Sequence, residues 1–192
     1  MSWNNLCCVG LLLAISALAG CATGPGTDGK RQAQQEEVSP EFRSQYQQVV
    51  SLMDQDPSRA RQELERLHQA RPDLTGPLLN LCILDFRDGD TEAARVCFDR
   101  VLAESPEQPD ALNHLGVMAR QDGEFGLAED WYRRALTADP DHLPSLRNLG
   151  ILLDIYQGRH REALELYQAY QALLPEPDPM VAQWVTDLKN RL

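Results

Sequence analysis

The sequence predicts an all-α protein built as a stack of helical repeats, and three observations carry this prediction. Identical residues recur 34 positions apart along the chain, in two series: Ala60, Ala94 and Ala128, then Pro72, Pro106 and Pro140. Within each period, apolar residues recur at the spacing of a helix face, and no stretch alternates as a half-buried strand would. A fixed period of this length indicates one supersecondary unit that stacks on copies of itself.

Residues 109–142 show best what each repeated position requires. Gly116 in the first helix and Ala128 in the second are small, so we expect these two residues to touch where the helices approach closely. Tyr132 is expected to fill the space between units, and Pro140 ends the second helix because proline cannot continue its hydrogen-bond ladder. The remaining positions of the pattern are held by Leu112, Leu115, Gly123 and Ala135. This pattern resembles the tetratricopeptide repeat (TPR) family.

The resemblance covers about residues 40–176 and implies a TPR-type right-handed helical solenoid of about four helix pairs. The units are expected at about 41–74, 75–108, 109–142 and 143–176, and the fourth gains one residue near its turn. Helix starts are predicted where an N-cap residue precedes a proline, at Ser39-Pro40, Asp56-Pro57 and Asp178-Pro179.

Residues 177–192 are predicted to form a capping helix over the last repeat, because an open solenoid end needs cover. One face of this segment carries Val181, Trp184, Val185, Leu188 and Leu192. The alternative is an exposed docking helix.

The N-terminus indicates an exported and lipidated protein. Residues 6–19 form an apolar run that is too short to span a bilayer comfortably and fits a secretory signal. The run ends in Leu18-Ala19-Gly20-Cys21, which resembles the lipobox of bacterial lipoproteins. That resemblance implies a signal peptide over residues 1–20, cleavage before Cys21, and acylation of this cysteine. Residues 21–39 are then the lipidated cysteine and a flexible linker. Because neither Ala22 nor Thr23 is an aspartate, the lipoprotein resemblance also implies sorting to the periplasmic face of the outer membrane of a Gram-negative bacterium.

Composition excludes some classes of function. The net charge of −11 disfavours nucleic acid, whose phosphates need a basic patch. The chain shows no nucleophile elbow, phosphate loop or metal-ligand spacing, so we predict no enzyme activity, no cofactor and no metal site.

Cys82 and Cys97 lie on the two helices of the second unit. They form either a disulfide in an oxidising compartment or two buried free thiols.

The concave groove lined by the first helix of each unit is the expected site for a protein or peptide partner. Asparagine amides there could bind a peptide backbone, arginines a carboxylate, and aliphatic residues an apolar side chain. By register, the predicted groove residues are Asn80, Ile83, Phe86, Arg87, Asn113, His114, Val117, Arg120, Arg147, Asn148 and Ile151.

These features together predict a membrane-anchored periplasmic adaptor for protein–protein interactions. A lipobox followed only by repeats also has a distant resemblance to the outer-membrane pilotin-type TPR lipoproteins of type IV pilus systems. That resemblance implies a role in assembling a pilus or secretion machine. The alternative is an adaptor for cell-wall hydrolases or envelope proteases.

Overall fold

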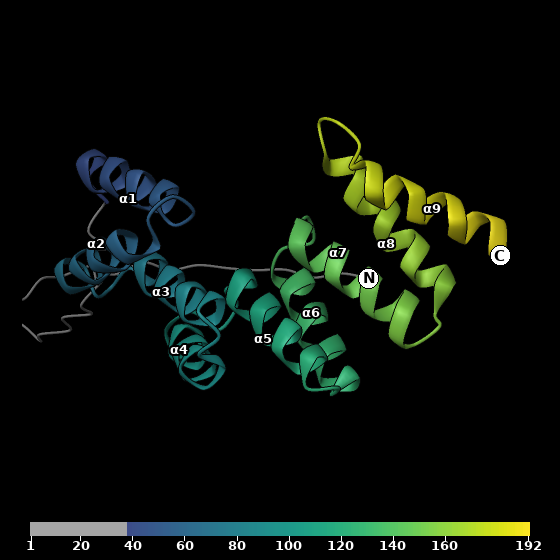
Figure 1. Cartoon of the computed structure of the whole chain (residues 1–192), viewed down its shortest axis with the longest axis horizontal. Coiled ribbons are helices and arrows are strands. Elements are labelled where there is room, and N and C mark those ends of the chain that lie inside the picture. The colour runs from purple at the N-terminus through teal and green to yellow at the C-terminus, as the bar shows by residue number, and fades with distance from the viewer. Residues whose placement is uncertain (1–37) are drawn as a thin grey trace, which may run out of the picture. The chain divides into compact units, whose positions relative to one another are not determined.

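A computed structural model describes residues 38–192, in which every regular element is a helix (Figure 1). The predicted signal peptide, Cys21 and most of the predicted linker lie outside the described residues. No helix within residues 38–192 is long and apolar enough to cross a bilayer. The elements in chain order are α1 (Pro40–Leu52), α2 (Pro57–Ala70), α3 (Thr75–Arg87), α4 (Thr91–Glu104), α5 (Pro109–Gln121), α6 (Phe125–Ala138), α7 (Leu143–Ile151), η1 (Leu152–Tyr156), α8 (His160–Leu173) and α9 (Pro179–Arg191).

The helices pair as the period predicts, since α1 packs on α2, α3 on α4, α5 on α6, and α7 on α8. Each pair then contacts the first helix of the next, which makes the domain a TPR-type helical solenoid (Figure 1). The three predicted N-caps are confirmed: the side chains of Ser39, Asp56 and Asp178 each accept a hydrogen bond from a backbone N–H in the first turn of their helix.

Glycines with positive φ close the turn inside the second, third and fourth pairs. Gly89 has φ 83°, Gly123 has φ 80° and Gly158 has φ 67°, a region that favours glycine because a Cβ is absent. The first two are 34 residues apart, whereas the third comes one residue late. The extra residue of the fourth repeat therefore lies before Gly158.

A π-helical turn, η1, takes up this extra residue. It continues α7 from Leu152 to Tyr156. Together α7, with 9 residues, and η1, with 5, are one residue longer than α3 and α5, which are each 13 residues long. The Gln157 N–H donates to the Leu152 carbonyl five residues back, at 3.2 Å. A wider turn accommodates one more residue without disturbing the helices on either side. Sequence reasoning detected the insertion but did not predict its form.

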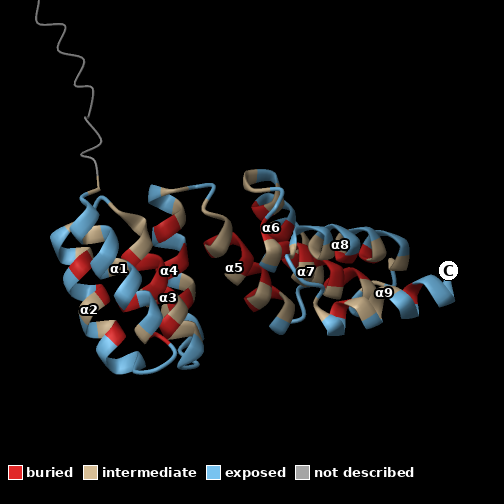
Figure 2. Cartoon of the chain, turned by 90° about the horizontal axis from the view of Figure 1, so that it is seen from above, coloured by how far each residue is buried: buried red, intermediate tan, exposed pale blue. Residues whose placement is uncertain are grey.

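The core runs along the solenoid as three apolar clusters, each shared between neighbouring repeats (Figure 2). The first two clusters along the chain each take side chains from a helix pair and from the first helix that follows, and the third takes them from α5 to α9. In the second cluster, for example, Leu78 of α3, Phe98 of α4 and Leu115 of α5 are all buried. No repeat therefore buries its apolar face alone, as expected for a solenoid.

The tight contact inside the third pair differs from the prediction. An added Cβ on Gly116 would lie 2.6 Å from Cε1 of Tyr132, and the atoms nearest to it all belong to that ring rather than to Ala128. Gly150 has the same relation to Tyr167 in the fourth pair, at 2.5 Å. The glycine of the first helix thus leaves space for an aromatic ring of the second helix, since a Cβ at this position would come too close to the ring.

The capping helix is confirmed. Val181 and Leu188 of α9 are fully buried, and Trp184 packs on the core of the last repeat, with its ring 5.3 Å from that of Tyr167. Leu192, predicted on the same face, is instead 55% exposed, because it follows the end of the helix at Arg191.

Candidate partner-binding face

The eleven predicted groove residues lie on α3, α5 and α7, and we call the surface that they mark the first-helix face. Neighbouring first helices meet along it, since α3 contacts α5 and α5 contacts α7. Residues of equal register join them directly. The amide of Asn80 donates to the Tyr46 hydroxyl of α1 at 2.6 Å, across 34 residues.

The asparagines of this face bind within the chain. Asn148 Nδ2 donates to Asn113 Oδ1 at 2.9 Å, which links α7 to α5. Asn80 and Asn113 are only 9% and 4% exposed. The prediction that Asn80 and Asn113 offer amides to a peptide backbone therefore needs correction: burial and these hydrogen bonds make them ties between repeats.

The aromatic part of the predicted face is also used between repeats. The His114 ring stacks on Phe98 at 5.1 Å and meets the edge of Phe86 at 5.8 Å. Its Nδ1 lies 2.8 Å from the Asp110 carbonyl, and burial lowers the pKa of His114. Exposed Arg87 forms an ion pair with Asp54, at 2.8 Å.

The aliphatic members of the face, Ile83, Val117 and Ile151, are half-buried and pack against the apolar clusters. Val49, which precedes them in the same register, is buried. They form an apolar floor that leaves part of each side chain accessible.

Arg147 belongs to the contact with the capping helix. Its guanidinium lies 5.6 Å from the centre of the Trp184 ring, and one terminal nitrogen is 4.0 Å from Met180 Sδ. Its charge also helps to lower the pKa of Asp178, a shift caused first by the hydrogen bond from the Val181 backbone. Arg147 thus packs between the first-helix face and α9, and it is not a freely accessible side chain of the face.

Arg120 resembles Arg147 in having a buried Nε without a hydrogen-bond partner in the described chain, but the aromatic ring beside Arg120 belongs to η1 and not to the capping helix. It is half-buried at the end of α5, its Nε is buried without a hydrogen-bond partner in the described chain, and its guanidinium lies 5.8 Å from the centre of the Tyr156 ring. No carboxylate within residues 38–192 forms an ion pair with it. The hydroxyl of Tyr132 is likewise buried and unpaired. Burial raises the pKa of Tyr132, and the charge of Arg120 offsets part of that rise.

A series of polar contacts that runs from the half-exposed side chain of Asp110 to buried His142, Ser145 and Asn113 was not predicted from the sequence. Asp110 Oδ1 lies 3.1 Å from His142 Nε2, His142 Nδ1 lies 2.8 Å from Ser145 Oγ, and Ser145 Oγ donates to Asn113 Oδ1 at 3.4 Å. The bond to His142 lowers the pKa of Asp110. Although the residue types match a hydrolytic triad, Ser145 is fully buried and no substrate could reach its hydroxyl. These contacts instead give hydrogen-bond partners to polar side chains where the third and fourth repeats meet.

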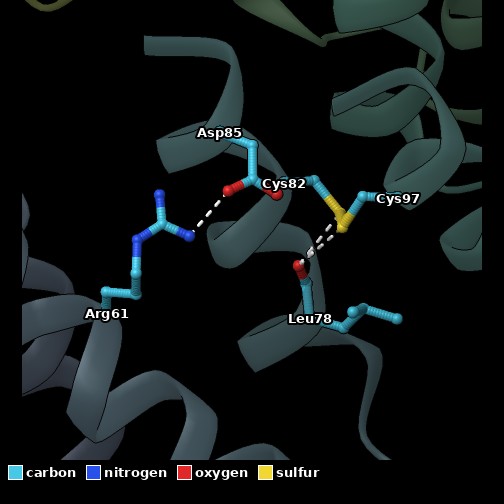
Figure 3. Close-up of a disulfide and its surroundings, with 5 residues drawn as sticks. All are labelled: Arg61, Leu78, Cys82, Asp85 and Cys97. Carbon is cyan, nitrogen blue, oxygen red and sulfur yellow. Dashed lines mark hydrogen bonds and ion pairs between the residues drawn. A yellow bond between two sulfur atoms is a disulfide. The ribbon is translucent and has the colours of Figure 1, made fainter. Parts of the chain in front are cut away.

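A disulfide joins Cys82 of α3 to Cys97 of α4, which decides between the two alternatives that the sequence left open (Figure 3). The sulfur atoms lie beside the Leu78 carbonyl, and both cysteines are buried. Nearby, Asp85 accepts a hydrogen bond from Arg61 of the first repeat at 2.6 Å, which ties the second repeat to the first (Figure 3). Among the described residues, no group of histidines, cysteines and carboxylates could hold a metal ion.

Comparisons with known proteins agree with this fold. Residues 80–142 match the model of the tetratricopeptide repeat family. The structure resembles pilF of Pseudomonas aeruginosa with a TM-score of 0.66, 17% identity, and coverage of 78% of this chain and 68% of the other. It resembles MamA from Desulfovibrio magneticus RS-1 with a TM-score of 0.57, 19% identity, and coverage of 80% and 86%. It also resembles the first TPR domain of Spaghetti (RPAP3) bound to the HSP90 peptide SRMEEVD, with a TM-score of 0.53, 16% identity, and coverage of 59% and 89%. No curated protein matches the chain in sequence.

The solenoid of paired helices and the apolar floor on its first helices define a repeat scaffold of the kind that binds proteins or peptides. Residues 80–142 match the tetratricopeptide repeat family, and the described part of the chain has the fold of such a helical repeat solenoid.

Proposed function

We propose that this protein is an envelope adaptor whose first-helix face binds an acidic segment of a partner protein. The observation that carries this proposal is Arg120, a half-buried guanidinium with no carboxylate partner in the described part of a chain of net charge −11. Arginine binds carboxylates in a two-pronged geometry, so an incoming acidic side chain would balance this charge.

The accessible parts of Ile83, Val117 and Ile151 support the same proposal, since they offer apolar contact along the neighbouring helices. A related observation concerns another protein: the similar TPR domain of Spaghetti (RPAP3) is seen with a peptide that contains two glutamates and an aspartate. Likeness at 16% identity reflects the fold alone, so the proposal rests on Arg120 rather than on that complex.

A photo-crosslinking amino acid placed at one of two exposed aliphatic positions tests where the partner binds. Ile155, 67% exposed on η1 and adjacent in sequence to Tyr156, tests for a partner near Arg120 and Tyr156. Val96, 54% exposed on the second helix α4, is the matched control. We expect illumination of intact cells to join a partner to the variant with the crosslinker at position 155, and a polyglutamate competitor to reduce the yield in isolated envelopes. Crosslinking mainly from position 96 would place the binding surface on the second helices and refute the proposal.

We also propose that the domain is held at the periplasmic face of the outer membrane by lipid on Cys21. The lipobox-like Leu18-Ala19-Gly20-Cys21 motivates this, and the Cys82–Cys97 disulfide supports an oxidising compartment. Cys21→Ala should abolish incorporation of labelled fatty acid and release the protein from the membrane fraction. Unchanged labelling would contradict the proposal.

We infer from the lipobox-like motif followed by helical repeats that the specific role is assistance in assembling a pilus or secretion machine, and the likeness to pilF agrees with this in fold. The second candidate is an adaptor for cell-wall hydrolases or envelope proteases. Deleting the gene in its native host separates the two: loss of surface pili or of secretion favours the first role. Normal assembly with altered wall cleavage or proteolysis favours the second.

A further inference from the structure

The extra residue of the fourth repeat builds a feature that the other repeats lack. In η1 the chain makes a π-helical turn, and this turn ends at Tyr156, whose ring lies 5.8 Å from the Arg120 guanidinium of the preceding repeat. The Phe125 ring of α6 contacts the same tyrosine at 4.7 Å. The insertion therefore places an aromatic ring beside an arginine that forms no ion pair with a carboxylate within residues 38–192.

The surroundings of Arg120 and Tyr156 have polar groups on the buried side and apolar side chains on the exposed side. On the buried side, Arg120 Nε and the Tyr132 hydroxyl both lack hydrogen-bond partners among residues 38–192. Natural proteins leave few such groups, so each one calls for an explanation. On the exposed side, Ile155 is 67% and Tyr156 is 44% exposed. Tyr156 thus places an exposed aromatic ring beside a half-buried cation, and a second exposed apolar residue precedes it in sequence.

The stacking also prepares the arginine for binding. A guanidinium lying near an aromatic ring keeps its N–H groups directed outward in its own plane, and it loses less side-chain freedom when an acid binds. Carboxylate is the complementary group because it accepts two parallel hydrogen bonds from this fork.

We propose that Arg120, Tyr156 and Ile155 form a binding subsite for a peptide segment in which an acidic residue lies within two positions of a large apolar residue. The acidic side chain pairs with Arg120, and the apolar side chain packs on Tyr156 and Ile155. This inference rests on the proposed adaptor function and specifies the chemistry that the partner presents.

Selection of random octapeptides displayed on phage, with the full chain immobilised, tests the subsite without knowledge of the partner. The same library is selected on Arg120→Gln and on Arg134→Gln. Arg134 is the matched control because its guanidinium also stacks on an aromatic ring, Trp131 at 4.4 Å, but on the second helix α6. We expect wild type and Arg134→Gln to enrich peptides with an acidic residue next to Leu, Ile, Met or Phe, and Arg120→Gln to lose them.

Synthetic versions of the enriched peptides then give affinities. Removing a charged hydrogen-bonding partner should weaken binding about 10- to 100-fold in Arg120→Gln. Tyr156→Leu should weaken it about 2- to 5-fold, through loss of the stacked ring. Circular dichroism melting of each variant confirms that it is folded.

Equal affinity of these peptides for wild type and Arg120→Gln would overturn the inference, as would a selection with no enrichment that depends on Arg120. Hydrogen exchange separates this failure from that of the proposed function. Peptides that still protect α3, α5 and α7 would leave the adaptor proposal intact with its acidic contact elsewhere. Protection confined to α2, α4, α6 and α8 would refute both.

Discussion

Gly116 lies against the ring of Tyr132 so closely that an added Cβ would come within 2.6 Å of Cε1. The tyrosine is fully buried and extends into the cluster that joins the third repeat to the fourth. This contact therefore sets how closely α5 and α6 approach, and it keeps the Tyr132 hydroxyl near Arg120.

Gly116→Ala should destabilise the domain by about 1–3 kcal/mol, because the buried ring has to move to admit one methyl group. Urea denaturation followed by circular dichroism measures the change. Gly126→Ala is the control, since nothing lies within 4 Å of its added Cβ in the first turn of α6. That control should be neutral or stabilising by up to about 1 kcal/mol. Equal effects of the two substitutions would mean that the Gly116–Tyr132 contact is not tight in solution.

The Cys82–Cys97 disulfide closes a loop with a sequence separation of 15 residues. Chain-entropy arguments assign about 3 kcal/mol to a loop of this size, so the Cys82→Ser, Cys97→Ser double variant should unfold at clearly lower urea concentration than the oxidised protein. A reducing agent should lower the midpoint of wild type but leave that of the double variant unchanged. A wild-type midpoint that does not respond to reductant would show that the bond contributes little.

His114 should make stability dependent on pH. Burial lowers its pKa in the folded state, so the unfolded state binds the proton more readily and stability falls as pH drops below about 6.5, the ordinary histidine value. The charged groups that act on it are Asp110 of its own helix, Arg87 of α3 and His142 before α7. His114→Gln should flatten this loss in denaturation curves recorded between pH 7 and pH 5. An unchanged slope would contradict the role of His114.

Asp110 should act in a separate and lower pH range. Its hydrogen bond to His142 lowers its pKa in the folded state, so its contribution is complete above about pH 4, the ordinary aspartate value, and is lost as pH falls below it. Asp110→Asn should therefore reduce stability at neutral pH and diminish the further loss in strong acid. A variant as stable as wild type at pH 7 would show that the Asp110–His142 contact adds nothing.

Trp184→Ala should loosen the capping helix. The indole packs on Tyr167 and Arg147, and half-buried aromatic contacts of this kind contribute on the order of 2 kcal/mol. Hydrogen exchange should quicken in α9 and in the adjoining part of α8, while α1 to α4 stay as protected as in wild type, because solenoid repeats contact only their neighbours. Uniform acceleration along the whole domain would instead indicate global cooperativity.

Much of this architecture follows from the sequence alone. The 34-residue period, the N-cap residues Ser39, Asp56 and Asp178, and the turn glycines are local features, and each acts on backbone within a few residues of itself. Their number and regularity determined the helix pairs, their order and the capping helix before any contact was known.

The binding face depended on tertiary structure. Asn113 binds Asn148 instead of a ligand, and Arg147 contacts Trp184 instead of solvent. Both contacts join side chains about one repeat apart in sequence, which come together only when the repeats pack. The form of the one-residue insertion was likewise decided by packing, which placed Tyr156 beside Arg120. Periodicity states which positions share a face, but hydrogen-bond partners and burial decide which of them remain free to bind.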